Sequence, residues 1–160
     1  NLLEPIASYA DEIIDTSSMN LHELRERILL TARGDEAPIL LSIESFGFKN
    51  GMPDGLDFVF DVRCLPNPHW KEQLREHSGQ DPEVINWLAG HDSVGNMIDD
   101  IDHFLQRWLP EFDRQARSYI TVGIGCTGGQ HRSVYIAEQL AERLRTLYPD
   151  LQLRHKELAA

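Results

Sequence analysis

The residues best suited to chemistry lie together in segment 126–133, which has the sequence CTGGQHRS. Gly128 and Gly129 allow the backbone to turn tightly and to approach a ligand closely. The guanidinium group of Arg132 presents a planar set of donors that matches a phosphate group. A plain turn would not need His131 and Arg132 beside two glycines. The segment therefore predicts an anion site, with phosphate as the best match.

The same segment has the Cys-x5-Arg-Ser spacing of the cysteine-dependent phosphatases. In that chemistry the Cys126 thiolate attacks phosphorus, Arg132 holds the phosphate, and Asp61 is the candidate general acid. Gly125 stands where those enzymes usually have a histidine. Four interpretations of the segment stay open from the residues alone: a phosphate receptor, a phosphatase, a tight turn around a buried cysteine, and part of a structural oligomerisation module.

Two elements must position this segment. Residues 119–126 form an apolar, β-branched run of strand length, and residues 134–141 carry apolar side chains at helical spacing. The first N–H groups of a helix have no partner within it, and the helix dipole places partial positive charge there. A strand, a glycine loop and a helix start in this order are typical of a phosphate site.

A second group of polar residues follows another predicted strand, residues 56–65. Ligands of open α/β sheets bind at the carboxyl ends of the strands, so side chains there should lie near the glycine loop. The candidates are Asp61, Arg63, Asn67 and His69. Asp61 and Arg63 share one face of the strand and could equally form a structural ion pair. His69 could equally serve as a helix cap.

The remaining periodicity predicts an α/β fold, a small and mostly parallel sheet with helices on both faces. Further strands are expected at residues 39–47 and, as an edge strand, at residues 151–156. Pro110 should bend or end the longest helix. Helices are predicted at residues 70–77, 82–89, 93–116 and 134–148.

Residues 1–35 differ from the rest of the chain. A short strand is predicted at residues 10–16, and Asn20 and Glu23 have the spacing of a capping box at the start of a helix. We interpret residues 1–35 as the last strand and helix of a preceding unit plus a linker, and residues 36–160 as the main domain. A helix that packs on the main domain is the equally weighted alternative.

Composition excludes several classes of protein. The net charge of −11 over 160 residues argues against broad, non-specific binding of nucleic acid. No apolar run approaches the roughly 20 residues that span a bilayer, so no membrane association is expected. The two cysteines lack metal-binding spacing, and Asp99, Asp100 and Asp102 fit a solvated helix face better than a metal site. We expect a reduced, cytoplasmic protein with no metal and no cofactor.

A local basic surface is still compatible with this charge. Lys49 stands out because lysine is scarce, and it could contact phosphate or simply be solvated. Arg154 and Lys156 alternate along the predicted edge strand, so they point to one side, toward solvent or an anionic partner.

Four blocks of sequence together resemble the C-terminal domain of the RapZ family of RNase adapter proteins. The blocks are SFGFK at 45–49, DVR at 61–63, LPNPHW at 65–70 and GCTGGQHRSVYIAE at 125–138. The resemblance implies a sensor domain rather than an enzyme, one that binds glucosamine-6-phosphate and a small regulatory RNA and presents that RNA to ribonuclease E. It also implies a cytoplasmic homo-oligomer, and it makes residues 1–35 the end of an N-terminal, P-loop kinase-like domain whose nucleotide-binding motifs lie upstream.

The resemblance also assigns residues to the two partners. The phosphate would contact the glycine-loop residues Thr127, Gly128, Gly129, His131, Arg132 and Ser133, with Asp61, Arg63, Asn67 and His69 nearby. RNA would contact Lys49, Arg154 and Lys156. The family's fold and activity are thus the expectations with which the structure is compared.

Overall fold

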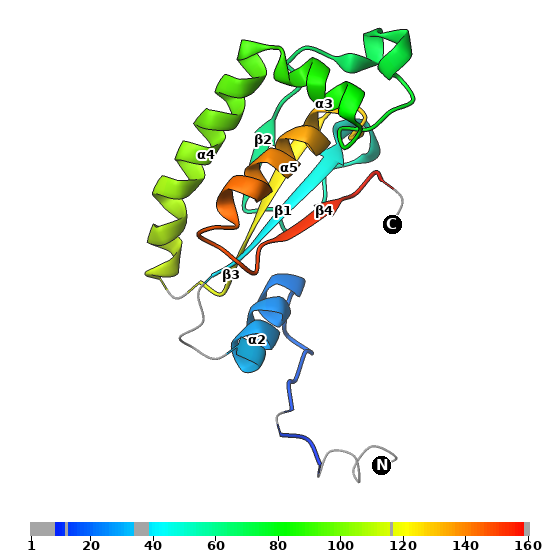
Figure 1. Cartoon of the computed structure of the whole chain (residues 1–160). Helices are drawn as coiled ribbons and strands as arrows, with labels where there is room; N and C mark the ends of the chain where they lie inside the picture. The colour runs from blue at the N-terminus through cyan, green and yellow to red at the C-terminus, as the bar shows by residue number, and fades with distance from the viewer. Residues whose placement is uncertain (1–8, 12, 34–38, 116, 159–160) are drawn as a thin grey trace.

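A four-stranded parallel sheet forms the centre of the computed structural model (Figure 1). The strand order is β2-β3-β1-β4. The strands are β1 (Leu40–Gly47), β2 (Phe58–Asp61), β3 (Tyr119–Cys126) and β4 (Gln152–His155). The structure describes residues 9–11, 13–33, 39–115 and 117–158, with the backbone alone for residues 22, 30 and 33. The predicted α/β fold class is confirmed.

The two central strands set the position of everything that follows them. β1 and β3 pair over eight residues each, from Leu40 opposite Tyr119 to Gly47 opposite Cys126. Every residue of β3 is buried. Because the strands are parallel and end level, the segments that leave Gly47 and Cys126 emerge at the same edge of the sheet.

Three helices pack on one face of the sheet (Figure 1): α3 (Pro82–Ala89), α4 (Asp92–Asp113) and α5 (Arg132–Leu144). Their apolar faces meet the alternate strand residues that point toward them, as a 3.6-residue helical period and a 2-residue strand period require. The centre of this core includes the fully buried side chains of Ile43, Val122, Ile124, Leu105 and Leu140.

The opposite face of the sheet is approached closely by segment 48–57. A Cβ atom at Gly123 would lie 2.5 Å from the side chain of Leu56, and one at Gly125 would lie 2.5 Å from the ring of Phe48. The two glycines of β3 therefore leave the space that this segment occupies. Its first residues form the 3-10 turn η1 (Phe48–Asn50).

The helix α2 (Leu21–Arg33) lies at the amino ends of the strands (Figure 1). The predicted capping box is confirmed, since Asn20 and Glu23 exchange hydrogen bonds of 2.8 and 3.0 Å. Ser118 donates its backbone N–H to the Glu26 carboxylate at 2.9 Å, and the Arg25 guanidinium lies 4.7 Å from the centre of the Tyr119 ring. The predicted domain boundary at residue 35 falls among residues 34–38, outside the described residues.

Several predicted elements differ from the structure. The described residues within 10–16 are not in a strand, and β2 spans Phe58–Asp61 rather than 56–65. The helix predicted at 70–77 is replaced by two 3-10 turns, η2 (Pro68–Trp70) and η3 (Glu72–Leu74). Leu74 is the one side chain of that segment that packs in the hydrophobic core. A single buried side chain provides too little apolar surface to stabilise a longer helix.

Pro110 lies inside α4, which continues to Asp113. A proline removes one backbone hydrogen bond but does not prevent another turn where packing holds the helix, and Leu109 just before it is fully buried. None of the helices in the described ranges combines the length and the apolar character needed to cross a bilayer.

Candidate functional site

The glycine loop connects β3 to α5 at the carboxyl edge of the sheet. Gly129 has φ of +75°, a backbone conformation that favours glycine. A Cβ atom there would also lie 2.6 Å from the backbone nitrogen of Gly47. The Gly129 N–H donates to the Sγ of Cys126 at 3.2 Å. Both conformation and space therefore require glycine at this position, and the tight turn brings the loop against the end of β1.

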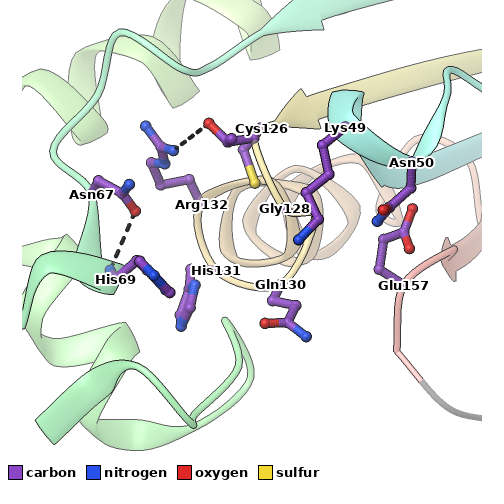
Figure 2. Close-up of a pocket in the computed structure, with 11 residues that line it drawn as sticks. Lys49, Asn50, Asn67, His69, Cys126, Gly128, Gln130, His131, Arg132 and Glu157 are labelled. Atoms are coloured by element: carbon purple, nitrogen blue, oxygen red, sulfur yellow. Dashed lines mark hydrogen bonds between the residues drawn. The ribbon is translucent and has the colours of Figure 1, made fainter. Parts of the chain in front are cut away.

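A cavity of about 290 Å³ opens over this loop (Figure 2). Its walls come from four segments that are far apart in sequence: the η1 turn, the η2 turn, the glycine loop and the segment after β4. Its lining comprises Lys49, Asn50, Asn67, His69, Cys126, Thr127, Gly128, Gln130, His131, Arg132 and Glu157. The volume lies near the lower end of the roughly 300–1,000 Å³ of small-molecule sites, which suits a small ligand.

Arg132 is the most constrained side chain of this pocket. It is 4% exposed, and its Nη1 donates to the carbonyl oxygens of Arg63 at 2.8 Å and Leu65 at 3.0 Å. Its Nη2 donates to the Oγ1 of Thr127 at 3.2 Å, while its Nε is buried and has no partner. Nε and Nη2 share one edge of the guanidinium group, the edge that pairs with two oxygens of an oxyanion.

No carboxylate of the described residues lies in direct contact with this guanidinium, and Asp61 interacts with it only at longer range. Among the described residues, Arg132 forms no ion pair. A buried charge is costly unless it is paired, and neutral carbonyls compensate it only in part. The arrangement therefore favours an anion bound at the Nε–Nη2 edge of Arg132, where Nε has no partner.

Two histidines stand beside Arg132, with ring centres 6.4 Å apart. Burial lowers the pKa of His131 below its ordinary value, and the neighbouring His69 and Arg132 act in the same direction. The Nε2 of His131 lies 3.0 Å from the Leu74 carbonyl oxygen, which can only accept, so Nε2 bears the proton. The neutral ring leaves Nδ1 as an acceptor for a hydroxyl or N–H group.

The η2 turn holds His69 at the wall of the pocket. Asn67 caps this turn, because its Oδ1 accepts the backbone N–H of His69 at 3.3 Å. Asn67, rather than His69, is thus the capping residue of this turn. Both side chains line the pocket (Figure 2).

Cys126 and Ser133 lie at the base of the loop. The Sγ of Cys126 is 3.1 Å from the Oγ of Ser133, and both residues are buried. Cys126 lines the pocket, whereas Ser133 is fully buried behind it. With the Gly129 N–H, Ser133 gives the sulfur two polar neighbours.

Asp61 and Arg63 lie outside the pocket lining and pair with each other. The Arg63 Nη2 is 2.6 Å from the Asp61 Oδ2, and this hydrogen bond lowers the pKa of Asp61. The Arg63 guanidinium also stacks on the Phe48 ring, 4.2 Å from its centre. Arg63 still supports the site through its backbone, since its carbonyl oxygen holds Arg132.

The three residues assigned to RNA lie on two sides of one segment. Lys49 lines the pocket, while Arg154 and Lys156 line a separate hollow of about 850 Å³. The Nζ of Lys156 donates to the carbonyl oxygen of Gly51 at 2.8 Å. Segment 49–51 therefore contributes Lys49 to the pocket and the Gly51 carbonyl oxygen to the hydrogen bond with Lys156.

Three lining residues were not among the predicted site residues: Asn50, Gln130 and Glu157. Asn50 and Gln130 are adjacent in sequence to predicted site residues, and this adjacency was the one signal that could have identified them. Glu157 follows β4, which pairs parallel to β1 and so ends at the same edge of the sheet as the glycine loop. Alternation alone predicts an edge strand there but not its direction, which is why Glu157 could not be placed.

Comparison with known proteins gives a consistent result. A family model described as the RapZ C-terminal domain matches residues 39–159. The chain is 52% identical over 159 residues to a "Nucleotide-binding protein" of Cellvibrio japonicus. This match covers 99% of the chain and 54% of that protein. The chain is 51% identical to a protein of the same name from Pseudomonas putida strain F1, and this match covers 99% of the chain and 56% of that protein.

A third relative, also named "Nucleotide-binding protein", comes from Saccharophagus degradans and is 51% identical over 158 residues. The match covers 98% of the chain and 54% of that relative. The chain thus spans about half the length of the curated relatives it matches.

Proposed function

The chain belongs to the RapZ C-terminal domain family, and we propose that its pocket is a receptor for glucosamine-6-phosphate rather than a catalytic centre. One observation supports this proposal most strongly. Arg132 is buried, lines a small pocket, forms no ion pair among the described residues, and keeps an Nε without a partner. A bound phosphate would supply the missing acceptor and the missing negative charge.

In this proposal the phosphate lies over the glycine loop. The Nε–Nη2 edge of Arg132 donates to two phosphate oxygens, and free N–H groups at the start of α5 donate to the others. Each charge-assisted hydrogen bond contributes roughly 1.5–3 kcal/mol. Asn67, His69 and the acceptor Nδ1 of His131, which lie beside Arg132 in the pocket (Figure 2), then contact the sugar hydroxyls.

We further propose that the sugar phosphate regulates binding of a small RNA. Lys49 would contact both ligands, because it lines the pocket and adjoins the segment to which Lys156 is hydrogen bonded. Ligand and RNA would then compete for cationic groups, which is a coupling between two sites. Unchanged RNA affinity at saturating sugar phosphate would argue against this competition.

The whole protein would then act as an RNase adapter. Its C-terminal domain would present the RNA to ribonuclease E, and its N-terminal, P-loop kinase-like domain would bind a nucleotide. We also propose that it is a cytoplasmic homo-oligomer. These statements rest on the family and on the names of relatives about twice as long as the chain.

The primary test is calorimetric titration with glucosamine-6-phosphate, with released phosphate assayed in the same sample. The receptor proposal predicts saturable binding to the chain without phosphate release. Arg145→Ala is the matched control for replacements of Arg132, because Arg145 is an exposed arginine outside the pocket. Failure of the wild-type chain to bind would contradict the proposal.

A phosphatase is a second candidate, favoured by one specific observation. Cys126 lies at the base of the loop with the Gly129 N–H and the Ser133 hydroxyl at its sulfur, an arrangement suited to a thiolate nucleophile. Its weakness is the leaving group, an alcohol that needs a proton. Asp61, the predicted general acid, is paired with Arg63 outside the pocket.

Replacement of Cys126 separates the two functions. Cys126→Ser should abolish turnover in a phosphatase because serine is a far weaker nucleophile without a dedicated base. A receptor should keep most of its affinity, because the Arg132 fork and the backbone donors remain. Release of phosphate that depends on Cys126 would establish the enzyme instead.

A further inference from the structure

The pocket has a negative side as well as a positive one. Arg132 lies at one side of the glycine loop and Glu157 at the other, with the Lys49 side chain between them (Figure 2). The carboxylate of Glu157 would repel a ligand that carried only a phosphate. The charge arrangement instead matches a ligand with an anionic group at one end and a cationic group at the other.

The fold holds Glu157 in this place. The Lys156 N–H donates to the carbonyl oxygen of Ser45 at 2.9 Å, which continues the pairing of β4 with β1 up to the residue before Glu157. A Cβ atom at Gly129 would overlap the Cγ of Glu157, so the absent side chain leaves room for the glutamate stem. Glu157 is therefore half-buried against the loop rather than extended into solvent.

The carboxylate keeps capacity for a cation. Its Oε1 accepts only a long hydrogen bond, 3.4 Å from the backbone nitrogen of Gly47. Within the described ranges, Glu157 forms no ion pair, although Lys49 lines the same pocket. A partly buried carboxylate in this state is stabilised by an ammonium group, which adds the attraction of opposite charges to the hydrogen bond that a hydroxyl could also donate.

We infer that Glu157 is the specificity residue that selects an amino sugar over a neutral sugar of the same shape, an inference that rests on the proposed phosphate receptor. The ammonium of the ligand would donate to the Glu157 carboxylate while its phosphate occupies the Arg132 edge. A hydroxyl in place of the ammonium would still fit but would lack the charge. Preference for the amino sugar should be roughly tenfold, the order expected when an ion pair is added to a hydrogen bond at a partly buried site.

The test compares glucosamine-6-phosphate with glucose-6-phosphate by calorimetric titration of the 160-residue chain. The wild-type chain should bind the amino sugar about tenfold more tightly. In Glu157→Gln the preference should fall to about twofold or less, with affinity for glucose-6-phosphate nearly unchanged. Glu142→Gln is the matched control, since it removes the same charge from an exposed site on α5 and should keep the full preference.

The outcomes separate the two proposals. If the wild-type chain binds neither sugar phosphate, the proposed receptor function fails. If it binds both sugars equally, the receptor stands and the role of Glu157 is refuted, with no variant needed for that conclusion. If the preference exists but persists in Glu157→Gln, another group selects the amine and the inference is wrong. Binding of inorganic phosphate by Glu157→Gln verifies that its loop is intact.

Discussion

Replacement of Arg132 by lysine is the sharpest test of how the pocket holds phosphate. Both Nη1 donors are used by the carbonyl oxygens of Arg63 and Leu65, and one Nη2 donor by Thr127. Two donors, one on Nε and one on Nη2, therefore remain for a ligand. A lysine keeps the positive charge, but its single ammonium cannot serve both the carbonyls and two phosphate oxygens.

The expected loss follows from this count of donors. Removing one of two charge-assisted hydrogen bonds weakens binding by roughly 1.5–3 kcal/mol, or about 10–150-fold in Kd. Arg132→Ala removes both, so roughly 3–6 kcal/mol should be lost. The alanine variant also leaves two carbonyl oxygens without their donor, at roughly 1–3 kcal/mol each in stability. The lysine variant is therefore the cleaner probe of binding.

The assay is titration of each variant with glucosamine-6-phosphate at fixed ionic strength, together with thermal unfolding. Arg145→Ala should bind like the wild-type chain, because this exposed arginine does not line the pocket. If a folded Arg132→Lys variant binds with wild-type affinity, the phosphate does not lie on the guanidinium edge. That result would refute the central geometric argument for the receptor.

Three further predictions concern the scaffold of the site. Gly129→Ala should lower the free energy of unfolding by at least about 1 kcal/mol, because alanine is strained at φ of +75° and its Cβ would overlap Glu157. Chemical denaturation measures this change, and an unchanged free energy of unfolding would contradict the backbone conformation of Gly129. Leu105→Ala should destabilise the core by roughly 2–5 kcal/mol, whereas Leu147→Ala, at an exposed position, should change stability by less than about 0.5 kcal/mol in the same experiment. The pKa of His131 is lowered from 6.5 by burial, so the unfolded chain binds its proton more readily and stability falls as pH drops below 6.5. His131→Asn should therefore lose less stability between pH 7 and pH 5 in urea titrations, and an identical loss would show that His131 does not titrate in this way.

The segment from β3 to α5 was predictable because its signals are local. An apolar run, adjacent glycines and helical spacing after Ser133 each depend on near neighbours in sequence. The structure accordingly has β3 ending at Cys126 and α5 beginning at Arg132. The fold class follows from the same periodicities.

The other features of the site depend on contacts between residues far apart in sequence, which a local pattern does not reveal. Alternation placed Asp61 and Arg63 on one face, but only the fold shows that they pair with each other. The direction of β4 decides whether Glu157 reaches the pocket, and a strand pattern has no direction. Segment 70–77 has helical spacing, yet it gives too little apolar surface to the core to remain a helix.

The strand order β2-β3-β1-β4 has a consequence for how the site comes into existence. The neighbours of β1 are β3 and β4, both much later in the chain, and every pairing in the sheet is parallel. Closing such long loops slows folding, and none of these pairings can be made by a simple hairpin. The glycine loop therefore cannot take its place against the end of β1 until β3 has been synthesised and has paired with β1, and Glu157 cannot reach the pocket until β4 has joined the sheet. Binding competence should appear as the last cooperative event of folding, at the same moment as the complete sheet.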